Sequence, residues 1–103
     1  DVRVVVVGGS YSGVELATSI ASRLGSRAHL TLVERGDEVL GRSPPHNVES
    51  AKAALASAKV DCKCATSVLR VGAGEIVVCP NEDDSAATTL DADLVLWTAG
   101  SRP

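Results

Sequence analysis

The sequence predicts an α/β domain in which a parallel βαβαβ sheet is followed by a β-meander and a closing strand. A valine-rich run opens the chain, two stretches with apolar residues at helical spacing follow, and a glycine turn separates two short apolar runs in the second half. The chain has 103 residues, of which 45% are hydrophobic and 22% are charged. This length and composition predict a single small globular domain.

The first half carries the parallel units. Residues 2–7 (VRVVVV) are expected to form a strand buried on both faces, because near-continuous valine is typical of parallel sheets. From Ser12 the apolar residues fall at helical spacing, and Gly25 is placed to close that helix. Residues 29–33 are the next strand-like run, which ends at Glu34.

A second helix is expected after residues 43–45 (SPP), since proline is tolerated in the first helical turn. Residues 60–65 are then expected to form a third parallel strand. Such βαβ units cross over with a right hand and leave a ligand crevice at the carboxyl ends of their strands. The apolar residues at helical spacing in the second helix are Val48, Ala51, Ala54, Leu55 and Ala58.

The second half of the chain is predicted to contain antiparallel strands and no helix. Residues 67–71 and 75–79 are expected to pair as an antiparallel hairpin around a glycine turn. Residues 80–87 (PNEDDSAA) are polar and predict the most mobile loop. Residues 88–90 lead into a last apolar strand over 93–97.

Composition excludes several classes of protein. Ten basic residues against thirteen acidic ones give a net charge of −3, and the chain has one Trp, one Tyr and no Phe. This argues against nucleic-acid binding, which needs a basic groove and aromatic platforms. No apolar run is long enough to span a membrane, and three Cys do not make a disulfide framework. We expect residues 1–103 to be one domain excised from a longer chain.

The strongest motif lies in residues 4–15 (VVVVGGSYSGVE). A dinucleotide fingerprint needs one glycine for a tight turn, a second for close approach to the pyrophosphate, and a third for helix–strand packing. Gly8 and Gly13 occupy the first and third places, and Ser10 occupies the second. We expect Gly9 to keep the turn open and the Ser10 hydroxyl to be available to a phosphate. The motif predicts a Rossmann-like fold.

An acidic residue at the end of the second predicted strand supports the prediction of a dinucleotide-binding fold. Glu34 lies about 20 residues beyond Gly13, the offset of the residue that binds the ribose 2′-hydroxyl. A carboxylate there favours NADH, whereas Arg35 could accommodate a 2′-phosphate, so NADPH stays open. An ordinary glycine turn in a flavodoxin-like domain is the alternative, and it accounts for the glycines but not for Glu34.

Three segments together resemble a known family. They are residues 8–17 (GGSYSGVELA), residues 32–40 (LVERGDEVL) and residues 94–103 (LVLWTAGSRP). They are similar to the NAD(P)H-binding domain of the pyridine nucleotide-disulfide oxidoreductase superfamily of flavoproteins. The closing WTAGSRP is most similar to type II (alternative) NAD(P)H:quinone dehydrogenases, including plant and cyanobacterial ones.

That resemblance implies a domain that presents NAD(P)H to an FAD bound outside these residues, which passes electrons to a quinone. Tyr11 matches an aromatic over the nicotinamide pocket, and Glu15 matches a carboxylate near the nicotinamide amide. Ala99 and Gly100 match a strand-end turn close to the nicotinamide and the flavin. Ser10 departs from the family's usual glycine. The resemblance implies a soluble domain whose parent is peripheral at a mitochondrial, plastid or bacterial inner membrane, which it contacts through other regions.

Several features of a complete flavoenzyme are missing from the sequence. It has no second fingerprint for FAD and no redox-active cysteine pair, and we expect no metal site and no catalytic residue. Cys62 and Cys64 are expected to be inert thiols on one face of a strand. A non-catalytic NAD(H)-sensing module and a methyltransferase are the competing functions. The expected cofactor-binding residues are Gly8, Gly9, Ser10, Tyr11, Ser12, Gly13, Glu15, Glu34, Arg35, Ala99 and Gly100.

Overall fold

Four parallel strands form the central sheet of the computed structural model, which describes residues 1–98. Their order across the sheet is β3-β2-β1-β7, so the first strand lies inside and is paired on both sides. Val4–Val7 of this strand are buried, as its valine run predicts, whereas Val2 and Arg3 are exposed. The strands are β1 (Val2–Val7), β2 (Ala28–Val33), β3 (Asp61–Lys63) and β7 (Leu94–Trp97).

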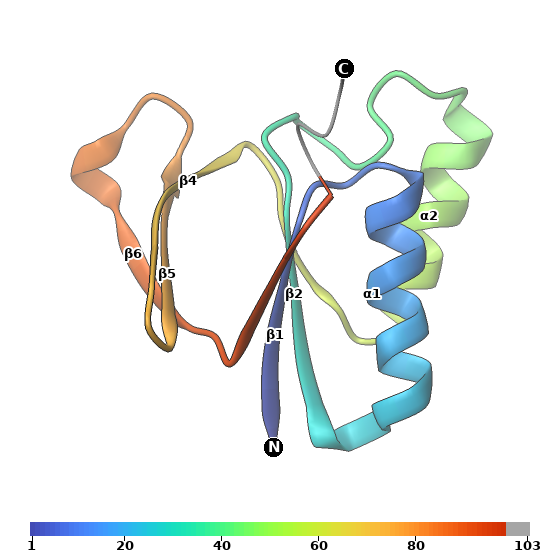
Figure 1. Cartoon of the computed structure of the whole chain (residues 1–103). Helices are drawn as coiled ribbons and strands as arrows, with labels where there is room; N and C mark the ends of the chain where they lie inside the picture. Colours follow the sequence, from blue (N-terminus) through green and yellow to red (C-terminus); the bar gives the residue numbers. More distant parts are fainter. Residues whose placement is uncertain (99–103) are drawn as a thin grey trace.

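Two helices cover one face of this sheet (Figure 1). Helix α1 (Tyr11–Leu24) begins after Ser10, which caps it, and ends at Gly25, whose φ of +57° suits glycine. A short 3-10 turn, η1 (Gly25–Arg27), leads into β2. Helix α2 (Pro45–Ser57) starts on a proline, where the missing N–H costs nothing.

An antiparallel meander covers the opposite face (Figure 1). It consists of β4 (Thr66–Gly72), β5 (Glu75–Pro80) and β6 (Thr88–Asp91), in that order. A 3-10 turn, η2 (Asp84–Ala86), lies between the last two strands. The sheet therefore lies between a helical layer and a β layer.

The valines of β1 pack against both the helical layer and the meander. Val4 and Val6 pack towards the helices, in a core that includes Leu32 and Leu55. The alternating residues Val5 and Val7 pack towards the meander, where the second core contains Val33, Ile76, Val78 and Ala92. Because successive side chains of a strand point to opposite faces, a strand between two cores needs apolar residues at every position.

The predicted fold class is confirmed, with differences in detail. The third strand is shorter than residues 60–65, and Pro80 ends β5 rather than opening a loop. Residues 88–91 form a meander strand of their own. Ala54, which was expected on the apolar face of α2, is exposed. Among residues 1–98, no helix is long and apolar enough to cross a membrane.

Candidate functional site

The carboxyl ends of three strands meet at one edge of the sheet. Val7 pairs with Val33 on one side and with Trp97 on the other, so the three strands end level. The next residue of each strand is tied to its neighbour: the Gly8 N–H donates to the Val33 carbonyl at 2.8 Å, and the Thr98 N–H donates to the Val7 carbonyl at 2.8 Å. This edge is where a ligand crevice is expected in such a fold.

Two glycines fix the turn from β1 into α1. Gly8 has a φ of +114°, which L side chains rarely adopt. A Cβ on Gly13 would lie 1.8 Å from the Gly8 carbonyl oxygen, so the helix start packs directly on the strand end. The helix–strand packing expected of Gly13 is thus present. The hydroxyl of Thr98 supports the same turn, 3.1 Å from the Gly8 carbonyl oxygen.

Both backbone polar groups of Gly9 form hydrogen bonds with the segment that follows β2. Its N–H donates to Glu34 Oε1 at 2.6 Å, and its carbonyl accepts from the Leu40 N–H at 2.9 Å. A Cβ here would meet Val39 Cγ1 at 2.9 Å and Glu34 Oε1 at 3.0 Å. The need for glycine at this position is therefore explained by packing against residues 34–40, which the sequence did not reveal.

The N-terminus of α1 opens onto the same edge. Ser10 is its N-cap, and its hydroxyl accepts from the Gly13 N–H at 3.4 Å, a long bond that leaves the hydroxyl proton available. The N–H groups of Tyr11 and Ser12 stand in the first turn, where a helix offers its donors no carbonyl partner. Together with the helix dipole, these donors can hold an anionic group such as a phosphate.

The two other residues expected on this helix lie at its surface. Tyr11 is 54% exposed, and its hydroxyl accepts a 2.7 Å hydrogen bond from Asn47 Nδ2, which links the starts of both helices. Glu15 is the fifth residue of α1 and is exposed. Its place near the amide of a nicotinamide stays a prediction.

Glu34 is held by two backbone amides. Its Oε1 accepts from the Gly9 N–H and its Oε2 accepts from the Gly36 N–H, both at 2.6 Å. A carboxylate has about four acceptor sites. Two backbone bonds therefore fix the orientation of this group and still leave acceptor capacity for ligand hydroxyls.

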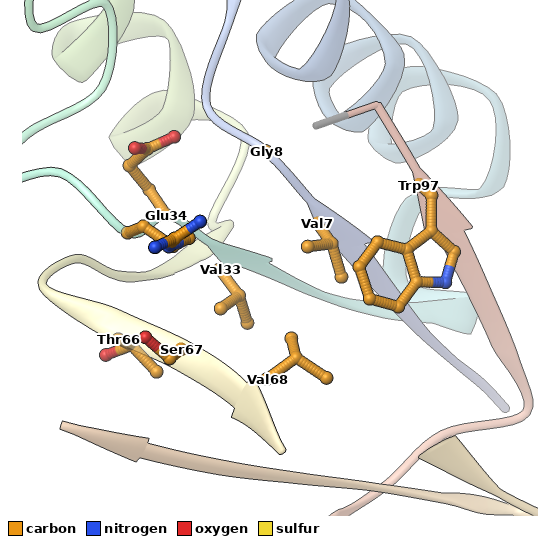
Figure 2. A pocket seen from close by; sticks show the side chains of 9 residues that line it. Val7, Gly8, Val33, Glu34, Thr66, Ser67, Val68 and Trp97 are labelled. Carbon is orange, nitrogen blue, oxygen red and sulfur yellow. The ribbon is translucent and has the colours of Figure 1, made fainter. Parts of the chain in front are cut away.

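A pocket of about 420 Å³ opens beside Glu34 (Figure 2). Three valines line its apolar side, and the indole of Trp97, 57% exposed, stands at one end. Glu34 and the segment from Thr66 form the opposite, polar end. Arg35 is the one cationic residue that lines the pocket. Such a pocket suits a planar, mostly apolar ring joined to a polar group. Its lining residues are Val7, Gly8, Val33, Glu34, Arg35, Thr66, Ser67, Val68 and Trp97.

The cysteines lie away from this pocket and are all free thiols. Burial raises the pKa of Cys62, of Cys64 and of Cys79, which keeps them in the weakly reactive protonated form. Within residues 1–98, no three His, Cys, Asp or Glu side chains come together in a group that could hold a metal ion.

Two residues that the sequence predicted for the site, Ala99 and Gly100, lie outside the described residues. Other residues at the site were not predicted. Trp97 and Thr98 were seen only as letters of a motif, although their place at the end of a strand next to β1 marks them as edge residues. Nothing in the sequence indicated that Thr66 and Ser67 line the pocket, because this depends on where the meander begins.

Comparisons with known proteins show which family this chain is similar to. A family model described as pyridine nucleotide-disulphide oxidoreductase matches residues 1–103. The chain is 37% identical over 100 residues to demethylphylloquinone reductase NdbB of Synechocystis, covering 97% of this chain and 24% of that protein. It is 32% identical over 111 residues to the Arabidopsis thaliana alternative NAD(P)H-ubiquinone oxidoreductase C1, chloroplastic/mitochondrial, covering 99% of this chain and 21% of that protein.

A solved structure shares the fold. NDH2 from Plasmodium falciparum in complex with NADH superposes with a TM-score of 0.86 at 17% identity, over 96% of this chain and 22% of that one. The chain thus spans a quarter or less of the length of these proteins.

Proposed function

This chain belongs to the pyridine nucleotide-disulphide oxidoreductase family, and on that premise we propose that residues 1–103 are the NAD(P)H-binding domain of a flavin-dependent NAD(P)H:quinone oxidoreductase. Both curated relatives named above are described as quinone reductases, which supports the quinone as electron acceptor of the parent protein. One relative is named as chloroplastic/mitochondrial and the other comes from Synechocystis. Both are compatible with a parent protein peripheral at an organelle membrane or at a bacterial inner membrane.

One observation carries the proposal: the glycine turn, the helix N-terminus and the carboxylate of Glu34 meet at one edge of the sheet, beside a pocket with apolar walls. The first-turn N–H groups of Tyr11 and Ser12 suit a pyrophosphate. The remaining acceptor sites of Glu34 suit the hydroxyls of a ribose. The valine-lined pocket beside Glu34 suits the base joined to that ribose.

The residues present thus fit a nicotinamide dinucleotide. When bound, the cofactor supplies a hydride to the flavin of the parent protein. The chain's own residues bind and orient: the helix N-terminus holds the phosphates, Glu34 fixes the ribose, and the packed turn at Gly8 and Gly13 sets the distance between them. None of these residues has to act as an acid or a base.

Glu34 favours NADH over NADPH in this proposal. An ionised carboxylate accepts from a 2′-hydroxyl but repels a 2′-phosphate, whereas the neighbouring Arg35 would attract that phosphate. The described residues contain no second strand–glycine turn–helix unit, so FAD is assigned to another part of the parent chain.

The full-length protein that carries this chain tests the proposal most simply. Purified from an expression host, it should be yellow, with a flavin absorbance that bleaches when NADH is added and returns when a quinone follows. A colourless protein that binds NADH would contradict the assignment to a flavoenzyme and favour a non-catalytic NAD(H)-sensing module instead.

A further inference from the structure

Asn81 connects the meander to the segment that follows β2. Its Nδ2 donates to the Arg35 carbonyl at 2.6 Å, and its Oδ1 accepts from the Ser67 hydroxyl at 2.6 Å. Its backbone N–H donates to the Ala65 carbonyl at 3.0 Å. One side chain thus joins two residues that line the pocket beside Glu34, although it does not line that pocket itself.

The residues on either side of Arg35 are held in a different way. The Glu34 carbonyl accepts from the Thr66 N–H at 3.1 Å, and the Gly36 carbonyl accepts from the Ala65 N–H at 2.7 Å. Both are bonds between backbone groups. The carbonyl of Arg35, between them, is held by the side chain of Asn81. The peptide between Arg35 and Gly36 is therefore the part of this turn that side chains hold: its carbonyl accepts from Asn81 and its N–H donates to Glu34 Oε2.

Glu34 depends less on Asn81 than Arg35 does. Its Oε2 accepts from the Gly36 N–H, which belongs to the peptide that Asn81 holds. Its Oε1 accepts from the Gly9 N–H, and its own N–H donates to the Lys63 carbonyl at 2.9 Å, so two of its contacts do not involve that peptide.

We propose that Asn81 is a positioning residue for cofactor discrimination, which fixes the Arg35 peptide and thereby the response of the site to a 2′-phosphate. The inference rests on the proposed function, in which Glu34 and Arg35 face the 2′-position of the adenosine ribose. A dinucleotide with a 2′-hydroxyl uses Glu34, which keeps its contacts with Gly9 and Lys63 when Asn81 is replaced, and so depends on Asn81 much less. One with a 2′-phosphate depends on the guanidinium of Arg35, and so on Asn81.

The test is a titration of wild type and Asn81→Ala with NADH and with NADPH, followed by the fluorescence of Trp97, the single tryptophan. In Asn81→Ala we expect the Kd for NADPH to rise about threefold to tenfold, the effect of one lost hydrogen bond, and the Kd for NADH to stay within about twofold. Asn81→Asp keeps an acceptor for Ser67 but loses the donor to Arg35, so it should weaken NADPH binding at least as much.

Ser85→Ala is the matched control. It removes one exposed side-chain bond of the same loop, from Ser85 Oγ to Asp83 Oδ1 at 2.6 Å, without touching Arg35 or Ser67. Both Kd values should stay at the wild-type level. Far-ultraviolet circular dichroism establishes that each variant is folded.

A second measurement does not need a cofactor. Hydrogen–deuterium exchange should be faster over residues 35–37 in Asn81→Ala, and unchanged at Ile76, a buried residue of β5. Equal losses of NADH and NADPH affinity would reduce Asn81 to a structural residue, and no loss of either would overturn the proposal. Failure of wild type to bind either dinucleotide would instead remove the proposed function, and with it this role of Asn81.

Discussion

The backbone N–H of Gly9 donates a 2.6 Å hydrogen bond to Oε1 of Glu34, a residue that follows a different strand. The second oxygen of the same carboxylate accepts from the Gly36 N–H at 2.6 Å. Glu34 therefore holds the glycine turn and the segment after β2 together before any ligand arrives. Pre-organisation of this kind lowers the cost of ordering a site on binding.

Replacing Glu34 should affect stability as well as specificity. In Glu34→Gln the amide has one oxygen for two N–H donors, so either Gly9 or Gly36 faces an NH₂ group. We expect a loss of about 1 kcal/mol in the free energy of unfolding, because water can replace the exposed bond to Gly36. Chemical denaturation measures this loss. Glu38→Gln is the control, because the pair of Glu38 with Lys52 at 2.9 Å is exposed and its loss should change stability little.

The same substitution should shift cofactor choice. Glu34→Gln removes the repulsion of a 2′-phosphate, so the ratio of the NADH and NADPH affinities should move towards NADPH by at least about tenfold, or 1.4 kcal/mol. Titration of both dinucleotides at fixed ionic strength measures this ratio. If the ratio does not move, the adenosine ribose lies elsewhere.

The improved NADPH affinity of Glu34→Gln should depend on Arg35. In the double variant Glu34→Gln/Arg35→Ala the improved NADPH affinity should disappear, because Arg35 is the one cationic residue that lines the pocket. NADH affinity should match that of Glu34→Gln alone. A double variant that keeps the NADPH gain would show that another cation binds the phosphate.

Gly13 should tolerate no side chain. In Gly13→Ala the Cβ would lie 1.8 Å from the Gly8 carbonyl oxygen, so α1 must move away from β1. We expect a loss of at least about 2 kcal/mol in the free energy of unfolding and weaker NADH binding. Gly41→Ala is the control, because its Cβ meets only the Glu38 carbonyl at 3.5 Å, and it should change stability by about 0.5 kcal/mol or less. Equal effects of the two variants would refute the packing role of Gly13.

The cysteines should react slowly with alkylating reagents. Burial raises the pKa of Cys62 and of Cys64, so less thiolate is present at neutral pH than in a free peptide thiol. The alkylation rate should keep rising at a pH where an unperturbed cysteine, with a pKa of about 8.5, has levelled off. Mass spectrometry after timed treatment with iodoacetamide follows each thiol. Faster modification than in a model peptide at neutral pH would contradict the role of burial.

The fold was largely predictable because its periodicities are local. The valines of β1, the end of α1 at Gly25, and the proline at the start of α2 each depend on a few neighbouring residues. The capping of α1 by Ser10 was not predicted. The strand over residues 88–91 was harder to see, since it is short and mostly exposed and gains its stability by pairing with β5.

The site was predictable only in part. Gly8, Gly13 and Glu34 stand at offsets that the strand–turn–helix geometry imposes, so a single sequence reveals them. The engagement of Gly9 by residues 34–40, and of Arg35 by Asn81, depends on loops whose paths the sequence does not determine. Irregular segments have no periodicity from which such contacts could be inferred.

A titration of this chain with NADH, by calorimetry and by Trp97 fluorescence, determines whether residues 1–103 bind the dinucleotide. We expect binding with a Kd on the order of 0.1–1 mM, because one domain supplies only part of a cofactor cleft, and no quinone reduction without added flavin. Absence of binding at about 10 mM NADH, or quinone reduction by this chain alone, would contradict this expectation.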